Sequence, residues 1–107
     1  MNRHITVLAT VAFVGLATCT VLAQSSGADI YKSKCAMCHS ADGSASSGAG
    51  KAMKVPSLLT PAAKKATTAS YVAIVKDGKG RMPAYGAKLS GPQIGAVVAY
   101  IRTLQKK

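Results

Sequence analysis

The sequence predicts a small all-α domain in which three to four short helices pack around one large bound group. The clearest helical pattern lies near the C-terminus, where apolar residues recur at the spacing of one helix face: Ile94, Val97, Val98, Ile101 and Leu104. The 107-residue sequence has no Trp and a single Phe, so an ordinary apolar core would be small. A domain of this size usually needs an additional stabilising group. Residues 35–39 supply an attachment point for one.

Residues Cys35, Cys38 and His39 form the pattern C-x-x-C-H, the attachment signature of a c-type haem. Thiols at this spacing face the same way on a helical turn or a tight loop, so both can form thioether bonds to the vinyl groups of one porphyrin. The histidine that follows lies under the iron, where a neutral imidazole is a good ligand. The pattern therefore predicts one haem c, attached through Cys35 and Cys38, with His39 as an iron ligand.

Three other roles fit these side chains less well. A thioredoxin-like redox pair needs a strand before the helix, whereas residues 29–34 have a helical pattern. A zinc site needs four ligands, and the mature chain is expected to offer only two Cys and one His. A disulfide between Cys35 and Cys38 would close a loop too short to stabilise the fold much.

Residues 1–23 have the organisation of a secretory signal peptide. Arg3 makes the start positive, an apolar run follows, and the small residue Ala23 fits the cleavage position. Cleavage there would leave residues 24–107 as one exported, periplasmic domain.

Two alternatives concern this same segment. An uncleaved anchor helix would use the apolar run, which is marginal in length for a membrane span. A lipoprotein would carry its lipid on Cys19, but Thr18 stands where Gly, Ala or Ser is expected. We therefore predict no stable membrane insertion after cleavage.

Helices are predicted in order at residues 27–34, 61–65, 69–76 and from residue 91 onward. Asp29 lies in the first turn of the first helix, where the helix dipole favours an acid. Thr60 and Ser90 fit as N-caps, and Gly78 fits as the end of the third helix. Residues 40–55 are rich in Gly, Ser and Ala, and they are predicted to form a loop rather than a packed element.

A six-coordinate iron needs a second ligand opposite His39. Only Met53 and Met82 are candidates, because His4 leaves with the signal peptide and Met37 lies on the His39 side of the ring. Met82 is favoured because a proline stiffens its loop, whereas Met53 lies in the Gly- and Ser-rich segment. A thioether ligand favours the ferrous state and raises the reduction potential. Filling both axial positions suits electron transfer and argues against catalysis.

Basic residues far outnumber acidic ones, at 14 against 3, and the formal net charge is +11. This charge favours redox partners with acidic docking surfaces, and its effect should weaken as salt rises. A solvated basic coat that keeps the protein soluble is the alternative. The lysines are scattered and no nucleic-acid-binding pattern is present, so no nucleic-acid partner is predicted. We expect a monomer.

The motifs that combine along the mature chain are Gly27 with Tyr31, Cys35-x-x-Cys38-His39, Asp42-Gly43, Pro56-x-Leu58, Met82-Pro83-Ala84-Tyr85 and the stretch from Val97 to Arg102. Together they resemble a class I monohaem cytochrome c of the small soluble bacterial or cytochrome c6-like group. The resemblance implies the small cytochrome c fold, with its first and last helices crossing at Gly27, Tyr31 and Tyr100. It also implies that the Pro56 carbonyl accepts a hydrogen bond from His39 and orients its ring.

These patterns lead to one main prediction and two alternatives. The main prediction is a periplasmic one-electron carrier that is not an enzyme. One alternative is a haem subunit of a larger oxidase or dehydrogenase complex. The other is an open-site haem enzyme or sensor, which would require that Met82 not bind the iron.

Overall fold

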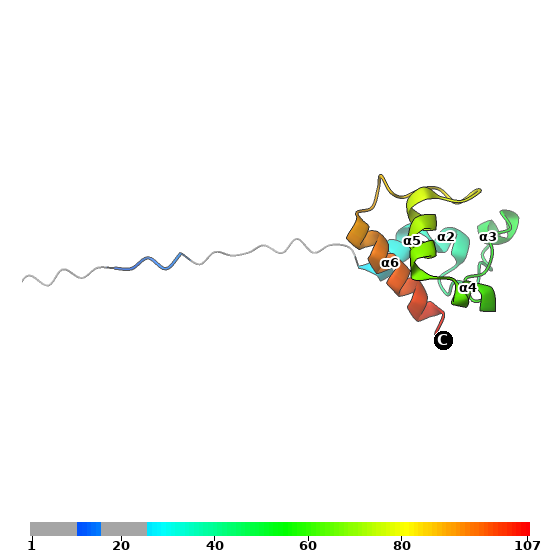
Figure 1. Ribbon diagram of the computed structural model, residues 1–107, viewed down its shortest axis with the longest axis horizontal. Coiled ribbons are helices and arrows are strands. Elements are labelled where there is room, and N and C mark those ends of the chain that lie inside the picture. Colours follow the sequence, from blue (N-terminus) through cyan, green and yellow to red (C-terminus); the bar gives the residue numbers. More distant parts are fainter. Residues whose placement is uncertain (1–10, 16–25) are drawn as a thin grey trace, which may run out of the picture.

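The computed structural model describes residues 11–15 and 26–107 (Figure 1). Residues 11–15 are exposed and have no regular secondary structure. The rest of the predicted signal peptide, including the cleavage position at Ala23 and the alternative lipidation site at Cys19, lies outside the described residues. None of the helices in the described part is long and apolar enough to cross a membrane.

Residues 26–107 form six helical segments and no strand: α1 (Gly27–Lys34), α2 (Ala36–His39), α3 (Gly48–Ala52), α4 (Pro61–Lys65), α5 (Thr68–Asp77) and α6 (Gly91–Leu104). The predicted all-α class is therefore confirmed. The predicted helices correspond to α1, α4, α5 and α6. The two additional segments, α2 and α3, are single turns of four and five residues.

Every helix except α2 has a Ser or Thr as its N-cap, and α2 follows α1 with only Cys35 between them. Ser26, Ser47, Thr60, Thr67 and Ser90 each accept a hydrogen bond from a backbone N–H in the first turn of the helix that follows. At α6 the Gln93 side chain also accepts from the Ser90 N–H, which completes a capping box. These local signals explain why the predicted helix starts agree with the structure.

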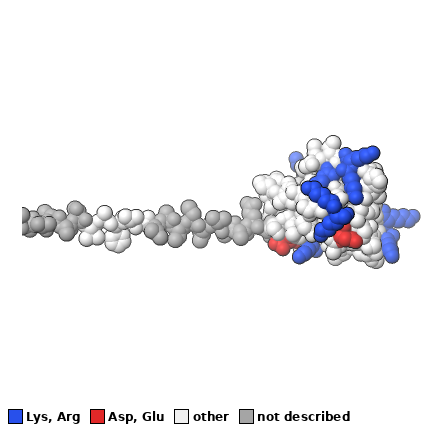
Figure 2. All heavy atoms as spheres, turned by 90° about the horizontal axis from the view of Figure 1, so that it is seen from below, with Lys and Arg blue, Asp and Glu red and all other residues white. Residues whose placement is uncertain are grey.

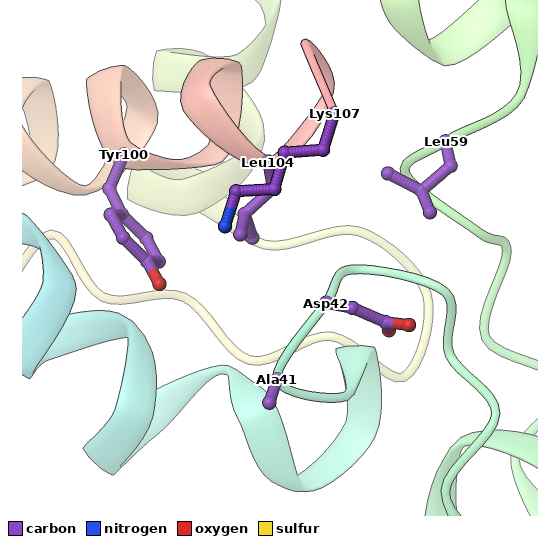
Figure 3. A pocket seen from close by; sticks show the side chains of 6 residues that line it. All are labelled: Ala41, Asp42, Leu59, Tyr100, Leu104 and Lys107. Atoms are coloured by element: carbon purple, nitrogen blue, oxygen red, sulfur yellow. The ribbon is translucent and has the colours of Figure 1, made fainter.

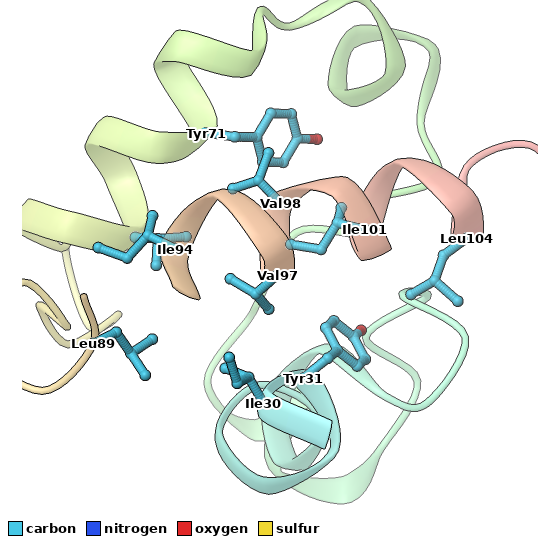
Figure 4. Packing of buried hydrophobic residues seen from close by; sticks show 10 residues of the cluster. Ile30, Tyr31, Tyr71, Leu89, Ile94, Val97, Val98, Ile101 and Leu104 are labelled. Carbon is cyan, nitrogen blue, oxygen red and sulfur yellow. The ribbon is translucent and has the colours of Figure 1, made fainter. Parts of the chain in front are cut away.

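The core lies where α1 crosses α6 (Figure 4). Ile30 and Tyr31 lie on one side of α6, and Tyr71 of α5 lies on the other. Tyr31 and Val97 are completely buried. Apolar residues at helical spacing on α6 thus serve two neighbours at once, α1 on one face and α5 on another.

The crossing itself depends on a glycine. A Cβ at Gly27 would collide with the backbone carbonyl of Ala96, so only glycine lets α1 approach α6 this closely. Beside this contact the rings of Tyr31 and Tyr100 lie 5.3 Å apart at an angle of 54°, a favourable tilted geometry for two aromatic rings. The implied contact of Gly27, Tyr31 and Tyr100 is therefore present.

The prediction that residues 40–55 form an unpacked loop is wrong. Residues 48–52 form α3, which packs against α2, and Gly50 is buried there. A Cβ at Gly50 would collide with the Cys38 carbonyl, and the Ser47 hydroxyl donates to the Met37 carbonyl at 2.8 Å. Small residues and hydroxyls therefore bring this segment onto the backbone of α2 rather than leaving it solvated.

Candidate functional site

The four predicted site residues, Cys35, Cys38, His39 and Met82, line a single cavity of about 1210 Å³. This volume exceeds the roughly 300–1,000 Å³ of most ligand pockets. Its wall is formed by α2, the segment from residue 53 to 60, α4, α5 and the loop from residue 79 to 88. Much of the wall is apolar, with contributions from Val55, Leu58, Tyr71, Ile74 and Val75.

Both cysteines of the attachment pattern sit on one turn of backbone. The N–H groups of Cys38 and His39 donate to the Cys35 carbonyl at 3.2 and 2.9 Å, which is the hydrogen bonding of a helical turn. Cys35 and Cys38 are free thiols, each half-buried in the cavity wall. Their spacing on this turn places both thiols at the same cavity, as double attachment to one ring requires.

Burial raises the pKa of the Cys35 thiol to about 11, against a smaller opposite effect of Lys34. A thiol that reacts as a redox nucleophile usually has a lowered pKa and a thiolate near neutral pH. Cys35 has the opposite environment. The structure also places α1 rather than a strand before the pattern, so the thioredoxin-like alternative has neither the expected fold nor the expected chemistry.

His39 presents a neutral imidazole to the cavity. Burial lowers the pKa of its ring, and the neutral form is the one that binds metals. Its Nδ1 atom is buried without a hydrogen-bond partner among the described residues, so the implied bond to the Pro56 carbonyl is not made, although Pro56 lines the same cavity. A buried ring nitrogen without a partner is costly, and metal ligation at one nitrogen with a hydrogen bond at the other is a usual way to satisfy such a ring.

Met82 lies at the end of a tight turn. The N–H of Lys79 donates to the Met82 carbonyl at 3.1 Å, the N–H of Met82 donates to the Lys79 carbonyl at 3.0 Å, and Gly80 has a φ of +57° between them. Turns of this kind favour glycine because it accepts a positive φ at no steric cost. Met82 therefore enters the cavity from a restrained backbone, and its half-buried side chain packs against the core cluster.

The other methionines of the domain also reach this cavity. Met53, the alternative ligand, follows the last residue of α3 and is half-buried in the wall. Met37 lies between the two cysteines and is 77% exposed. Met82 differs from both because only its side chain is also packed against the buried core cluster.

Sequence reasoning missed two tyrosines of the wall. Tyr85 donates from its hydroxyl to the Lys34 carbonyl at 3.1 Å, which ties the loop after Met82 to the last turn of α1. Tyr71 lines the cavity from α5, where the sequence indicated only an apolar helix face. Lys34 lies 51 residues before Tyr85 in the sequence, and the place of Tyr71 in the wall depends on how α5 packs, so no local pattern could have identified these contacts.

A second, smaller hollow of about 370 Å³ lies beside the C-terminal end of α6 (Figure 3). Its lining residues are Ala41, Asp42, Leu59, Tyr100, Leu104 and Lys107. None of the four predicted site residues contributes to it. The Asp42 carboxylate already accepts a hydrogen bond from the Ser44 N–H at 2.9 Å, and its contacts with Ser44 lower its pKa. The larger cavity is therefore the candidate site.

The candidate site is bordered by positive charge. The basic side chains that line the larger cavity are Lys34, Lys54, Lys79, Arg81 and Lys88, and its described lining includes no Asp or Glu. Figure 2 shows how Lys and Arg outnumber acidic side chains on one face of the domain. A ligand with acidic groups, or a partner with an acidic surface, would meet a favourable field here.

The donor set and the shape of this cavity fit a covalently attached haem. Two thiols on one turn, a neutral imidazole with an unpartnered nitrogen, and a restrained thioether all face a large, mostly apolar space. Soft sulfur and imidazole ligands suit haem iron. The described residues contain no cluster of three or more His, Cys, Asp or Glu side chains that could hold a metal ion by themselves.

Comparisons with known proteins give a consistent result. A family model described as "Cytochrome C oxidase, cbb3-type, subunit III" matches residues 23–101. Cytochrome c6 of Leptolyngbya boryana is 38% identical over 77 residues, covering 72% of this chain and 87% of that protein. Cytochrome c6 of a Picosynechococcus species is 35% identical over 102 residues, covering 91% of this chain and 86% of that protein.

The fold also has a counterpart among solved structures. The KustC0563 c-type cytochrome superposes with a TM-score of 0.69 at 19% sequence identity, over 76% of this chain and 99% of that one. At this level of identity the likeness concerns the fold, and it supports the helical arrangement described above.

Proposed function

Because this chain belongs to the cytochrome c family, we propose that it is a periplasmic one-electron carrier whose iron is ligated by His39 and Met82. Family membership confirms the predicted resemblance, and with it a covalently bound c-type haem and a place in electron transport. The observation that carries the proposal is the convergence of both thiols, the imidazole and the thioether on one cavity. When bound, the haem supplies a single iron that takes up and releases one electron.

The side chains of the cavity would divide the work as follows. Cys35 and Cys38, which lie on one helical turn, would hold the ring through two thioether bonds. His39, kept neutral by burial, offers a nitrogen as the proximal ligand. Met82, restrained by its turn, offers a soft sulfur that favours the ferrous state. The apolar part of the wall would cover much of the ring and so limit the solvent reorganisation that accompanies a change of charge.

The proposed ligation by His39 and Met82 would suit a carrier rather than an enzyme. With His39 and Met82 in place, no position would remain for a substrate or for peroxide. The only histidine of the described residues is His39 itself, so no distal histidine is available there to assist bond cleavage. We therefore propose that the protein is not an enzyme.

The ligand assignment is tested by replacing Met82 with alanine and comparing Met53→Ala as the matched control. We expect the Met82 variant to lose the weak near-red band of ferric His/Met haem, to bind carbon monoxide when reduced, and to have a lower potential. The Met53 variant should keep the band and exclude carbon monoxide. The opposite pattern would assign the ligand to Met53, and rapid binding of carbon monoxide to the unaltered protein would favour the open-site enzyme or sensor.

We propose that the partners are redox proteins with acidic docking surfaces, and that this protein binds them as a monomer. Five basic side chains border the cavity while its described lining has no acidic one, which supports this choice. The second-order rate of reduction by an acidic donor protein should fall steeply as salt rises. A flat dependence would mean that the basic residues are only a solvated coat.

Export is proposed to follow cleavage after Ala23, which leaves residues 24–107 in the periplasm. The mass of the protein recovered from the periplasm tests this directly. A mass that includes residues 1–23, or one that includes a lipid on Cys19, would show a membrane-anchored form instead.

A second candidate function is a haem subunit of a larger oxidase complex. The description of the matching family model, an oxidase subunit, favours it. The native size of the protein in extracts separates the two proposals, because a carrier would elute as a small species and a subunit would elute with its complex.

A further inference from the structure

One set of polar contacts lies behind the wall of the haem cavity. Arg102, in the last turn of α6, donates from Nη1 to the Lys64 carbonyl at 3.4 Å and from Nη2 to the Ala66 carbonyl. Its guanidinium also stacks over the ring of Tyr71, with Cζ 4.5 Å from the ring centroid. One side chain therefore joins α6 to the end of α4 and to α5.

Gln105 completes the set. This residue is only 8% exposed. Its Nε2 donates to the Leu58 carbonyl and to the Tyr71 hydroxyl, both at 2.8 Å, and its Oε1 accepts from Arg102 Nη1 at 2.9 Å. The Tyr71 hydroxyl in turn donates to the Ala63 carbonyl at 2.9 Å. Every polar atom of the Gln105 side chain has a partner, which is how a buried polar group is stabilised.

These contacts end at residues of the cavity wall. Leu58, Ala63, Ala66 and Tyr71 all line the cavity, whereas Arg102 does not. The guanidinium is thus one layer of residues behind the wall. Figure 4 shows that Tyr71 lies on the side of α6 opposite the α1 contact, so these contacts are separate from that part of the core.

We propose that Arg102 and Gln105 are positioning residues that hold the Tyr71 wall of the haem cavity, and that the charge of Arg102 raises the reduction potential. The proposal rests on the proposed electron-carrier function. An arginine keeps its charge at every physiological pH, and the hydrogen-bond acceptors of Arg102 are all neutral oxygens that do not cancel it. Reduction adds one electron to the iron, so a fixed positive charge behind an apolar wall favours the reduced form.

The test compares the potentials of haem-loaded Arg102→Gln, Arg102→Lys and Lys106→Gln. Lys106 is the matched control, because it is an exposed cation near the same end of α6. We expect Arg102→Gln to lower the ferrous-to-ferric ratio at a given potential by about threefold to tenfold, where tenfold corresponds to 59 mV for one electron. Lys106→Gln should change it less than twofold, because its charge is screened by solvent.

Arg102→Lys separates charge from geometry. Lysine keeps the positive charge but lacks the planar guanidinium that bonds two carbonyls and stacks on Tyr71. The reduction potential of this variant should therefore stay close to that of the parent protein, whereas the variant should unfold at a lower denaturant concentration. The electrostatic role would be overturned if the reduction potential shifted equally in Arg102→Gln and Lys106→Gln. It would also be overturned if the potential shifted as much in Arg102→Lys as in Arg102→Gln. Unchanged unfolding in both Arg102 variants would overturn the positioning role.

The near-red band keeps this test separate from the proposed function. If the unaltered protein lacks the band, the His39/Met82 carrier proposal fails whatever Arg102 does. If the band is present in every variant and the potential does not move with Arg102→Gln, the carrier proposal stands and the inference about Arg102 is refuted.

Discussion

The two faces of α6 are built on different principles. Toward α1 the packing is complete: Tyr31 and Val97 have no exposed surface, and Gly27 brings one backbone against another. Toward α4 and α5, α6 supports the wall of a cavity of about 1210 Å³, in which the buried Nδ1 of His39 has no hydrogen-bond partner within the part of the chain that the structure describes. The first face packs against a neighbour that has no further role, whereas the second packs against elements that form the wall of a space large enough to receive another group.

This difference separates two kinds of mutational effect. A change at the crossing of α1 and α6 should alter the free energy of unfolding and leave the haem chemistry as it is. A change in the cavity should alter attachment, ligation or potential. Variants that violate this division would show that the two faces are coupled through α6.

The largest effect is expected when both attachment thiols are removed, in Cys35→Ala with Cys38→Ala. Without thioether bonds the haem should separate from the chain under denaturing conditions, and the small domain should lose most of its stability. Haem staining after denaturing electrophoresis and the mass of the chain measure attachment, while far-UV circular dichroism measures folding.

The single variants Cys35→Ala and Cys38→Ala are the controls for the double variant. Each should keep one thioether bond and therefore a haem that stays with the chain on denaturation. A double variant that remained as stable as the parent would mean that the elements around the cavity, like the crossing of α1 and α6, are stable without an attached haem.

A smaller effect, and one confined to stability, is expected from Gly27→Ala. The new Cβ would collide with the Ala96 carbonyl, a backbone atom of a buried helix that cannot move alone, so we expect a loss of about 2–3 kcal/mol in the free energy of unfolding. Gly95→Ala is the matched control on α6. No atom of residues 11–15 or 26–107 lies within 4 Å of its added Cβ, and alanine inside a helix is favoured over glycine by about 0.5–1 kcal/mol.

Denaturant unfolding measures both glycine variants, and the reduction potential is recorded alongside. We expect opposite signs in stability and no change in potential. A shift of potential in Gly27→Ala would show that the crossing is not independent of the cavity.

Local signals explain which parts of this molecule were predictable. The helices α4 and α6 begin where they were predicted, at Thr60 and Ser90 as N-caps. An N-cap can be recognised because the residues that form its hydrogen bonds lie within four positions of one another in the sequence. The thiols and His39 are likewise adjacent in sequence, so their common cavity followed from the pattern. By contrast, α3 was missed because Gly- and Ser-rich composition usually indicates a loop, and its stability comes from contact with the carbonyls of α2.

Long-range contacts explain the rest. Tyr71 of α5 and Gln105, the C-cap of α6, meet only in the folded chain, and neither has a local sequence signal for this contact. The Tyr85 hydroxyl bonds the Lys34 carbonyl although the two residues are 51 positions apart in the sequence. The sequence did identify Met53 and Met82 as the two ligand candidates and favoured Met82, but their packing could not be predicted: both line the cavity, and only Met82 also packs against the core cluster.

The smallest effect is expected at a hydrogen bond that joins α1 to the C-cap residue of α2. The Tyr31 hydroxyl donates at 2.6 Å to the carbonyl of Ser40, the residue after His39. Tyr31→Phe removes this hydrogen bond without opening a cavity, and the Ser40 carbonyl keeps its bond from the Gly43 N–H. We therefore expect a loss of about 1 kcal/mol in the free energy of unfolding, with the haem still attached.

The pH dependence identifies this contribution. Burial raises the pKa of Tyr31 above its ordinary value of 10.0, and the nearby Tyr100 and Asp42 have smaller effects in the same direction. Ionisation at high pH is therefore easier in the unfolded chain, so the stability due to Tyr31 is fully present below about pH 10 and declines as the pH rises further. Other groups also titrate in this range, but they are present in both the parent and Tyr31→Phe, so their effect cancels in the difference between the two. The difference in unfolding free energy between parent and Tyr31→Phe should accordingly be constant from pH 6 to about 9 and should shrink above pH 10. A difference that stayed constant to higher pH would mean that Tyr31 ionises as easily in the folded chain, and that the crossing is more open to solvent than its packing indicates.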